Sequence, residues 1–326
     1  MTIFVSIAAY CDRLLEQTVR DMLAKASNPD KLRFGIVEQN FAEKRFKHDD
    51  IKTQVRYVGI DVRDTRGVCW ARSLAMSLYS GESWFMQIDS HMMFDQGWDD
   101  RLLKAASQCS TLSPKFLISN YPNLFNMVDG VPVLKKVTEN ALLHVVNEDC
   151  KFESNNLFLL FKGKEIKTTL PVKGFHVAAG FIFTQGRFVY EVPYDPQMYF
   201  EGEEQTLAVR AYTHGWDIYH ISNNPTYHLY NIDHNPITIH RELHWTAEED
   251  KQRNTRWWDL NNNSIARMNA LLLQGADLGI YGLGKVRSLV EYANFSGIDY
   301  RNKTIADHAK NREDVVQTVL LNDKEK

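Results

Sequence analysis

The sequence contains no long hydrophobic run, and its cysteines are few. Across 326 residues, no apolar stretch approaches the roughly 20 residues that a membrane-spanning helix needs, so we expect no membrane span. The apolar start at Ile3–Tyr10 is short and has no basic lead, which favours a first core strand over a signal peptide and predicts a cytoplasmic protein. The four cysteines are widely spaced without a Cys-x-x-Cys pair, which argues against structural zinc and a disulfide framework.

Several familiar motifs are also missing. No Gly-x-Gly-x-x-Gly follows the first predicted strand, which argues against a dinucleotide dehydrogenase, and no Walker sequence indicates a phosphate-loop ATPase. The Gly-x-Ser-x-Gly elbow of α/β-hydrolases is absent as well. The formal net charge is -3 with both signs well mixed, so we do not expect a general nucleic-acid surface.

What the sequence does contain is enough apolar surface for a large core, arranged in alternating strands and helices. It is 44% hydrophobic and 12% aromatic. We predict strands at 3–9, 32–37, 55–59 and 84–88, and helices at 12–26 and 72–79. This alternation predicts an α/β fold with a mostly parallel central sheet flanked by helices, and with ligands at the carboxyl ends of the strands. Tyr10, Glu38 and Asp89 follow such ends and are therefore candidate ligand-binding residues.

The most informative segment is the end of the fourth predicted strand, Phe-Met-Gln-Ile-Asp-Ser-His at 85–91. In an extended segment, residues two apart point the same way, so Asp89 and His91 share a face and could hold one metal ion. A helix start at 67–72 precedes them and carries Arg72, which could face a phosphate or simply pair with an acid. A metal pair, a helix start and an arginine together suit a diphosphate, as in a nucleotide-sugar transferase.

Other candidate residues have a bland explanation beside the functional one. His228, in a short predicted strand, could be a third metal ligand, although a single histidine is more often structural. Three acids at a helix start, Glu201, Glu203 and Glu204, suit the helix dipole, but one of them could face sugar hydroxyls. Tyr10 and Asp12 fit a base and ribose pocket, while Asp12 also suits a plain helix N-cap.

The remaining sequence predicts one continuous unit. Further strands are expected at 116–120, 157–161, 177–183, 216–222 and 227–230, with a hairpin at 162–163 in a segment, 131–170, that is hard to assign. The small residues within 177–183 indicate a close approach by another group. We predict a catalytic domain at 1–245, with the donor and metal site in 1–100 and the acceptor site and third ligand in 170–245. Residues 246–326 would form a C-terminal helical extension, and a polar loop at 231–250 would close over the site.

Several blocks closely resemble the polypeptide N-acetylglucosaminyltransferases typified by the enzyme that modifies hydroxyproline on Skp1. They lie in the same order along nearly the whole chain, at 67–72, 87–92, 202–204, 227–230, 281–289 and 295–299. A more distant resemblance is to the mucin-type polypeptide GalNAc-transferases. Both resemblances imply a GT-A fold, a UDP-sugar donor, Mn²⁺ and retention of anomeric configuration. They also imply that Asp89, His91 and His228 are metal ligands and that Arg72 and Glu203 belong to the donor and sugar site.

The combined expectation is a retaining glycosyltransferase that depends on Mn²⁺, or else on Mg²⁺, because an imidazole ligand favours Mn²⁺. It would move a sugar, most simply GlcNAc from UDP-GlcNAc, to an acceptor hydroxyl on a protein or glycan. Two other classes remain open: a nucleotide-sugar phosphohydrolase, and a non-catalytic module that binds a nucleotide sugar or glycan. The sequence does not predict the acceptor or the oligomeric state.

Overall fold

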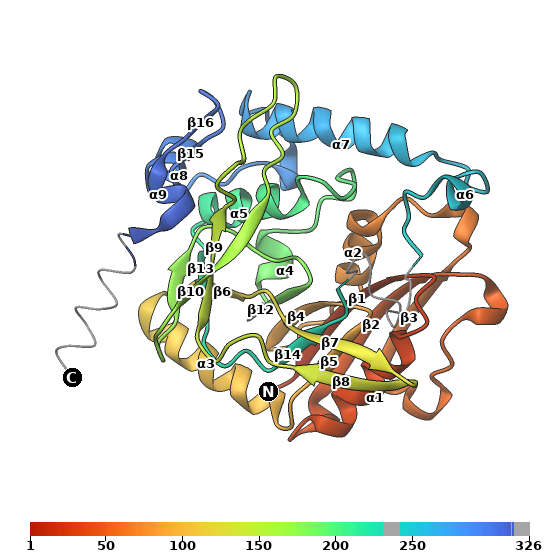
Figure 1. The fold of residues 1–326 in the computed structure, drawn as a ribbon. Coiled ribbons are helices and arrows are strands. Elements are labelled where there is room, and N and C mark those ends of the chain that lie inside the picture. Colours follow the sequence, from red (N-terminus) through yellow and green to blue (C-terminus); the bar gives the residue numbers. More distant parts are fainter. Residues whose placement is uncertain (231–241, 314, 316–326) are drawn as a thin grey trace.

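The computed structural model describes residues 1–230, 242–313 and 315, and it is built around one large sheet (Figure 1). The eight strands of this sheet run in the order β11-β13-β6-β12-β4-β1-β2-β3. Their bounds are β1 Ile3–Tyr10, β2 Leu32–Gln39, β3 Val55–Ile60, β4 Trp84–Asp89, β6 Phe116–Ser119, β11 Val172–Gly174, β12 Phe181–Gln185 and β13 Asp217–His220. The α/β fold predicted from the sequence is confirmed.

The sheet is mixed, with four parallel and three antiparallel pairings. The parallel pairings join β1 to β2 and β4, β2 to β3, and β6 to β13. The strand β12 runs antiparallel between β4 and β6, so its beginning lies beside the carboxyl end of β4. Residues that lead into β12 therefore reach the sheet edge at which the ligand site was expected.

Helices cover both faces of this sheet (Figure 1). Their bounds are α1 Leu15–Lys25, α2 Val68–Ser77, α3 Trp98–Leu112, α4 Phe188–Glu191, α5 Glu203–Thr213, α6 Ala247–Asp250, α7 Trp257–Leu272, α8 Leu289–Ser296 and α9 Asp307–Asn311. Val19 of α1 and Trp98 of α3 share one buried apolar cluster with Val5 of β1. On the other face, α2, α4 and α5 pack against side chains such as Phe85 of β4. The two clusters follow from the alternation of side chains along each strand.

Smaller sheets complete the fold. Four strands, in the order β5-β14-β7-β8, form the second sheet: β5 Met92–Phe94, β7 Asn123–Val128, β8 Val131–Lys135 and β14 Thr226–His228. Two hairpins consist of β9 Ala141–Val146 with β10 Phe161–Ile166, and of β15 Ile298–Asp299 with β16 Thr304–Ile305. The antiparallel register of β14 on β5 places His228 opposite Met92, and hence beside the chain at His91. The second sheet thus brings a distant histidine to the end of β4.

Two predicted strands differ from the structure. The run 157–161 is not a strand, because Leu157 and Leu159 are buried against the core and their backbones are held by the side chain of Gln205. The strand is β10, which pairs with β9, so the hairpin predicted at 162–163 is wrong. Residues 177–180 of the predicted strand 177–183 form a loop before β12.

The C-terminal helices share the hydrophobic core of the rest of the chain. Met268 and Leu272 of α7 and Tyr292 of α8 belong to the same buried cluster as Leu207 of α5. The segment before α7 returns to the N-terminal half, where the backbone N–H of Asn254 donates to the carbonyl of Arg63. Among the described helices, none has the length and apolar character that crossing a bilayer requires.

Candidate functional site

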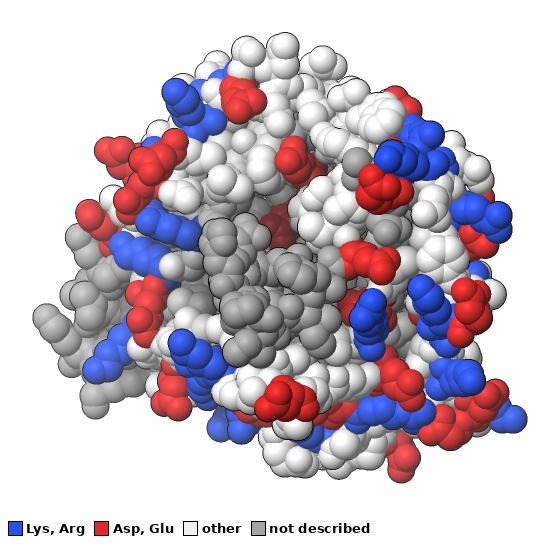
Figure 2. Space-filling model, turned by 45° about the vertical axis from the view of Figure 1, so that its right-hand side comes forward, with Lys and Arg blue, Asp and Glu red and all other residues white. Residues whose placement is uncertain are grey.

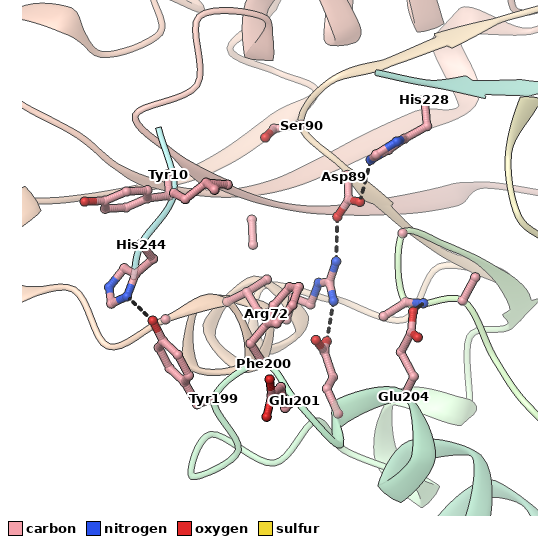
Figure 3. Close-up of a pocket in the computed structure, with 18 of the residues that line it drawn as sticks. Tyr10, Arg72, Asp89, Ser90, Tyr199, Phe200, Glu201, Glu204, His228 and His244 are labelled. Atoms are coloured by element: carbon pink, nitrogen blue, oxygen red, sulfur yellow. Dashed lines mark hydrogen bonds and ion pairs between the residues drawn. The ribbon is translucent and has the colours of Figure 1, made fainter. Parts of the chain in front are cut away.

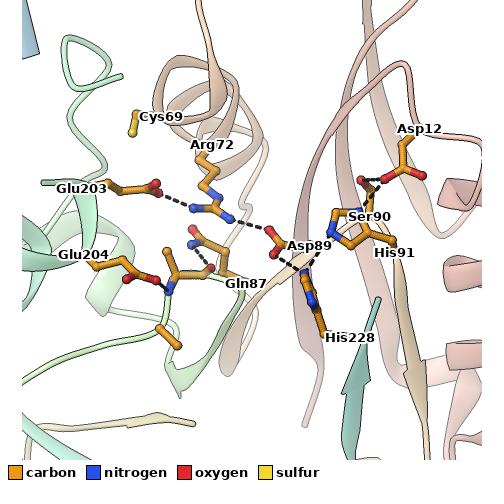
Figure 4. Close-up of polar contacts among 12 residues, drawn as sticks. Asp12, Cys69, Arg72, Gln87, Asp89, Ser90, His91, Glu203, Glu204 and His228 are labelled. Atoms are coloured by element: carbon orange, nitrogen blue, oxygen red, sulfur yellow. Dashed lines mark hydrogen bonds and ion pairs between the residues drawn. The ribbon is translucent and has the colours of Figure 1, made fainter. Parts of the chain in front are cut away.

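Three side chains that could hold a metal ion lie together at the carboxyl end of β4 (Figure 4). The ligand atoms of Asp89, His91 and His228 all lie within 4.8 Å of one another. The two Nε2 atoms of the histidines are 3.0 Å apart, and Asp89 Oδ2 is 3.2 Å from Nε2 of His228. Two ligand atoms at right angles around an ion, each about 2.1 Å from it, are separated by about 3 Å, so the spacing fits a small divalent cation.

Asp12 holds the imidazole of His91 in place. Its Oδ2 lies 2.6 Å from His91 Nδ1 and also accepts a 2.6 Å hydrogen bond from Ser90, while Oδ1 accepts one from the backbone of Leu14. A carboxylate on Nδ1 fixes the tautomer that presents Nε2 to a metal. Burial alone would raise the pKa of Asp12, but attraction to His91 and the hydrogen bonds lower it to about 2. Asp12 also lines the cavity described below. It does not cap α1, which has no side-chain cap.

Arg72 connects Asp89 to the start of α5. It donates a 2.6 Å hydrogen bond to Asp89 Oδ1 and a second bond to Glu203, which Tyr194 also contacts. The two carboxylate oxygens of Asp89 therefore face different partners, Oδ1 toward Arg72 and Oδ2 toward His228. Both terminal nitrogens of Arg72 donate hydrogen bonds to carboxylates. Of the two partners that the sequence suggested for Arg72, a phosphate or an acid, the structure shows the acid. The hydroxyl of Tyr194 was not anticipated.

In this cluster, burial and the neighbouring charges shift the pKa values of the side chains in opposite directions. Burial would raise the pKa of Asp89, but Arg72 and the bond to His228 hold it well below its usual range. Burial also opposes the charge of Arg72, yet its carboxylate partners raise its pKa well above the ordinary value. The pKa of Glu203 is raised by burial even though Arg72 works in the opposite direction. Asp89 is thus an ionised carboxylate with a fixed orientation.

The loop before β12 passes directly beside Asp89. The backbone N–H of Asp89 donates to the carbonyl of Gly180, and a Cβ at position 180 would lie 2.6 Å from Asp89 Oδ2. Ala179 is held from both sides, by Glu204 at its N–H and by Gln87 at its carbonyl. The small residues in this segment therefore do mark a close approach, as the sequence indicated.

These residues line a cavity of about 420 Å³, which opens between the sheet edge and the start of α5 (Figure 3). The predicted candidates Tyr10, Asp12, Arg72, Asp89, His91, Glu203 and His228 all contribute to its wall. Acidic lining residues are Asp12, Asp89, Glu201, Glu203, Glu204 and Glu242, whereas Arg72 is the only lysine or arginine among the described ones. Figure 2 shows the hollow, with acidic atoms at its bottom and rim. Elsewhere on that face, charges of both signs are interspersed.

The far wall of the cavity comes from the C-terminal part of the chain. The ring of His244 lies 4.9 Å from that of Tyr10, between the hydroxyls of Thr65 and Tyr199 at 2.8 and 2.7 Å. Burial lowers the pKa of His244 to about 3, so the ring is neutral. Within the predicted loop at 231–250, residues 231–241 lie outside the described residues, while 242–245 line the cavity.

Glu38 lies away from this cavity. Its carboxylate accepts hydrogen bonds from the backbone of Phe46 and from the side chains of Asn40 and Tyr57, at 2.8–2.9 Å. The next residue, Gln39, lines the cavity instead. The carboxylate of Glu38 fastens the loop after β2, so its assignment as a donor contact stays a prediction without a supporting contact here.

The sequence matches the glycosyltransferase family described as Glycosyltransferase (GlcNAc), over residues 2–50 and 42–302. The chain belongs to this family. Nothing in the family match distinguishes the Skp1-modifying enzymes suggested by the sequence blocks. No curated protein matches the sequence of this GlcNAc-family glycosyltransferase significantly.

Solved structures show what this GlcNAc-family chain is similar to in fold. GalNAc-T7, solved with UDP, GalNAc and Mn²⁺, aligns with a TM-score of 0.57 at 13% identity, covering 93% of this chain and 58% of GalNAc-T7. The chain thus spans less than two thirds of that protein. Residues 1–349 of TarS from S. aureus align with a TM-score of 0.43 at 12% identity, covering 83% of this chain and 72% of TarS. The first similarity supports the predicted GT-A fold.

Proposed function

We propose that this protein is a metal-dependent glycosyltransferase that moves a sugar from a UDP-sugar to an acceptor hydroxyl, with retention of configuration. The observation that carries the proposal is the cluster of Asp89, His91 and His228 at the carboxyl end of β4, inside a cavity of a glycosyltransferase-family chain. Open α/β sheets bind their ligands at this edge.

The charge balance of the cavity favours a divalent cation. The positive charge of Arg72 is already matched by Asp89 and Glu203, so a diphosphate would meet no spare lysine or arginine on the described lining. One carboxylate and two imidazoles suit Mn²⁺ better than Mg²⁺, which prefers oxygen ligands. When bound, such an ion neutralises the charge that develops on the departing diphosphate.

The side chains around the ion have separate tasks in this proposal. Asp12 orients His91, and Arg72 orients Asp89. Glu203 holds Arg72 and faces the sugar. Tyr10 and the ring of His244 form the wall on which the base of the nucleotide would lie. The acceptor hydroxyl attacks the anomeric carbon on the face from which UDP departs. The bond from that carbon to the β-phosphate oxygen breaks, and this oxygen takes the proton of the hydroxyl.

The donor and acceptor rest on the comparisons. The family description names GlcNAc, and the GalNAc-T7 structure contains UDP, GalNAc and Mn²⁺, so an N-acetylhexosamine carried by UDP is the simplest donor, with UDP-GlcNAc first. The resemblance to polypeptide N-acetylglucosaminyltransferases favours a hydroxyl on a protein or on a glycan attached to it.

The test is a UDP-release assay over UDP-, GDP- and dTDP-sugars, with and without Mn²⁺. Wild-type protein is compared with Asp89→Asn, which keeps the size of the side chain, and with Asp30→Asn as a control, since Asp30 is exposed and outside the cavity. We expect Mn²⁺-dependent release from a UDP-sugar that Asp89→Asn abolishes and Asp30→Asn retains.

Other outcomes identify the rival classes. Rapid cleavage of a UDP-sugar, with no transfer of the sugar to any acceptor preparation, would indicate a phosphohydrolase. Binding of UDP and Mn²⁺ by calorimetry without turnover of any donor, even with acceptor extracts, would indicate a binding module. Full activity in metal-depleted buffer would refute the role of the three ligands.

A further inference from the structure

Glu204 and His176 form a second pair of polar side chains that line the same cavity. Glu203 and Glu204 are consecutive at the start of α5, but they point to different partners (Figure 4). Glu203 binds Arg72, whereas Glu204 Oε1 accepts a 2.7 Å hydrogen bond from the backbone of Ala179. Glu204 is partly exposed and lines the cavity, so its second oxygen is available on the cavity side.

His176 lies beside Glu204 and is 1% exposed. Its ring stacks on Phe161 with centroids 3.5 Å apart and planes 9° apart, and it also lines the cavity. Nε2 lies 3.5 Å from Glu204 Oε2, yet neither ring nitrogen makes a hydrogen bond with the described part of the chain. Buried polar atoms normally have a partner, so an imidazole placed this way indicates a missing ligand or water.

The surroundings of the pair restrict what that ligand can be. Aromatic residues Tyr121, Phe158, Phe161 and Tyr230 line the cavity around it. Positive side chains near it are lacking among the described lining residues, so a phosphate or another anion would be unfavourable beside Glu204. Aromatic walls with a few polar groups suit a neutral ring that has an apolar face and hydroxyl edges.

The pair is also close to the metal ligands. Ala179, which Glu204 fastens, is followed by Gly180, the residue that packs against Asp89. The rings of Tyr230 and His228 lie 4.3 Å apart between centroids. Burial raises the pKa of Tyr230, and the negative charges of Asp89 and Glu204 raise it further. A ligand held by Glu204 and His176 would therefore lie next to the reaction centre.

We propose that Glu204 and His176 form a subsite for the hydroxyl groups of a sugar ring, separate from the cluster of Arg72, Asp89 and Glu203. The inference rests on the proposed function and names two positioning residues for it. The ring is either the sugar of the donor or a sugar on the acceptor, and the two sources share this chemistry.

The test measures sugar binding by calorimetry in the presence of Mn²⁺. His176→Phe keeps the stacked ring and removes the nitrogens, and Glu204→Gln keeps the oxygen that binds Ala179. His144→Phe is the matched control, because His144 is a buried neighbour of His176, at 5.8 Å between rings, that does not line the cavity. The probes are UDP, UDP-GlcNAc, and free N-acetylglucosamine added to protein saturated with UDP. Thermal unfolding checks that each variant is folded.

A donor subsite predicts that both variants bind UDP-GlcNAc at least about tenfold more weakly, as loss of a charged hydrogen bond implies, while their affinity for UDP is unchanged. An acceptor subsite predicts unchanged UDP-GlcNAc affinity but loss of N-acetylglucosamine binding to the UDP-saturated protein. The proposal is overturned if the variants bind all three probes like wild type, or if His144→Phe has the same effect. Wild-type protein that fails to bind UDP with Mn²⁺ would instead refute the proposed function itself.

Discussion

Asp12 gives the sharpest test of how the proposed metal ligands are held. Asp12→Asn keeps the shape of the side chain but replaces one carboxylate oxygen by an NH₂ group, which donates. Nδ1 of His91 lies 2.6 Å from Oδ2, and its N–H would lose this acceptor, while the bond from the Leu14 backbone to Oδ1 can persist. The variant should fold and bind Mn²⁺ more weakly.

The size of the effect follows from the single bond that is lost. Removing a hydrogen bond to a charged group costs about 1.5–3 kcal/mol, which corresponds to roughly a 10- to 100-fold increase in the Kd for Mn²⁺. Loss of a carboxylate behind a metal-bound histidine has effects of the same order, about 10- to 100-fold. Because the pKa of Asp12 is about 2, its carboxylate is charged at any pH near neutrality, so the charge is present in wild type throughout the titration.

The assay is a calorimetric titration with Mn²⁺, which gives the Kd of each variant. The free energy of unfolding in urea is measured in parallel. Ser90→Ala serves as the control, because it removes the other 2.6 Å bond to the same oxygen without touching His91. A Kd for Asp12→Asn within about threefold of wild type, in a protein that remains folded, would refute the role assigned to Asp12.

Three further predictions concern stability and metal binding. Arg72→Met removes the cation between the partly buried carboxylate of Asp89 and the buried carboxylate of Glu203. It should lower the free energy of unfolding in urea by about 3 kcal/mol, and an unchanged midpoint would contradict this. Gly180→Ala should weaken Mn²⁺ binding because its Cβ would press on Asp89. Gly186→Ala is the control: its Cβ would clash with Tyr79 and the Glu82 backbone, so it should lower stability and leave the Mn²⁺ affinity unchanged. Burial lowers the pKa of His220 to about 3 in the folded protein. Below about pH 6.5 the unfolded chain therefore binds a proton at this histidine that the folded protein does not bind. The free energy of unfolding should fall as the pH drops toward 3, and by about 2 kcal/mol at pH 5 because of this residue. Urea unfolding of His220→Leu should depend less on pH over that range than unfolding of wild type, and equal slopes would refute this.

Local patterns in the sequence predicted the strands near the site well. The apolar runs at the positions of β1, β2 and β4 are bounded by polar residues, so their ends, and the residues that follow them, could be placed to within two residues. The two-residue period of a strand suggested that Asp89 and His91 lie on one face, although β4 ends at Asp89 and His91 lies in the bend before β5. His228 was a candidate from its place in a short predicted strand, and the family resemblance supported it. Its approach to His91 could not be predicted, because it depends on the register between β14 and β5.

Contacts between distant segments could not be predicted in this way. The apolar run at 157–161 has the composition of a strand, but Leu157 and Leu159 are buried in the core cluster that includes α5 rather than in a sheet. The bond between Asp12 and His91 and the bridge formed by His244 each join residues that no periodicity relates. Glu38 shows the converse case, because its position after a strand suggested a ligand contact while its carboxylate serves the local loop.

The position of β12 in the sheet also bears on how the chain is synthesised. Until residues 181–185 leave the ribosome, β4 has β1 on one side only, and its apolar sequence forms an open edge. Such edges invite pairing with other chains, and long-range strand pairs form slowly. His228, the third of the proposed metal ligands, appears later still, with β14. A nascent chain that stops between these strands would therefore be prone to aggregation and unable to use metal as a source of stability, so chaperone dependence should be greatest in that window.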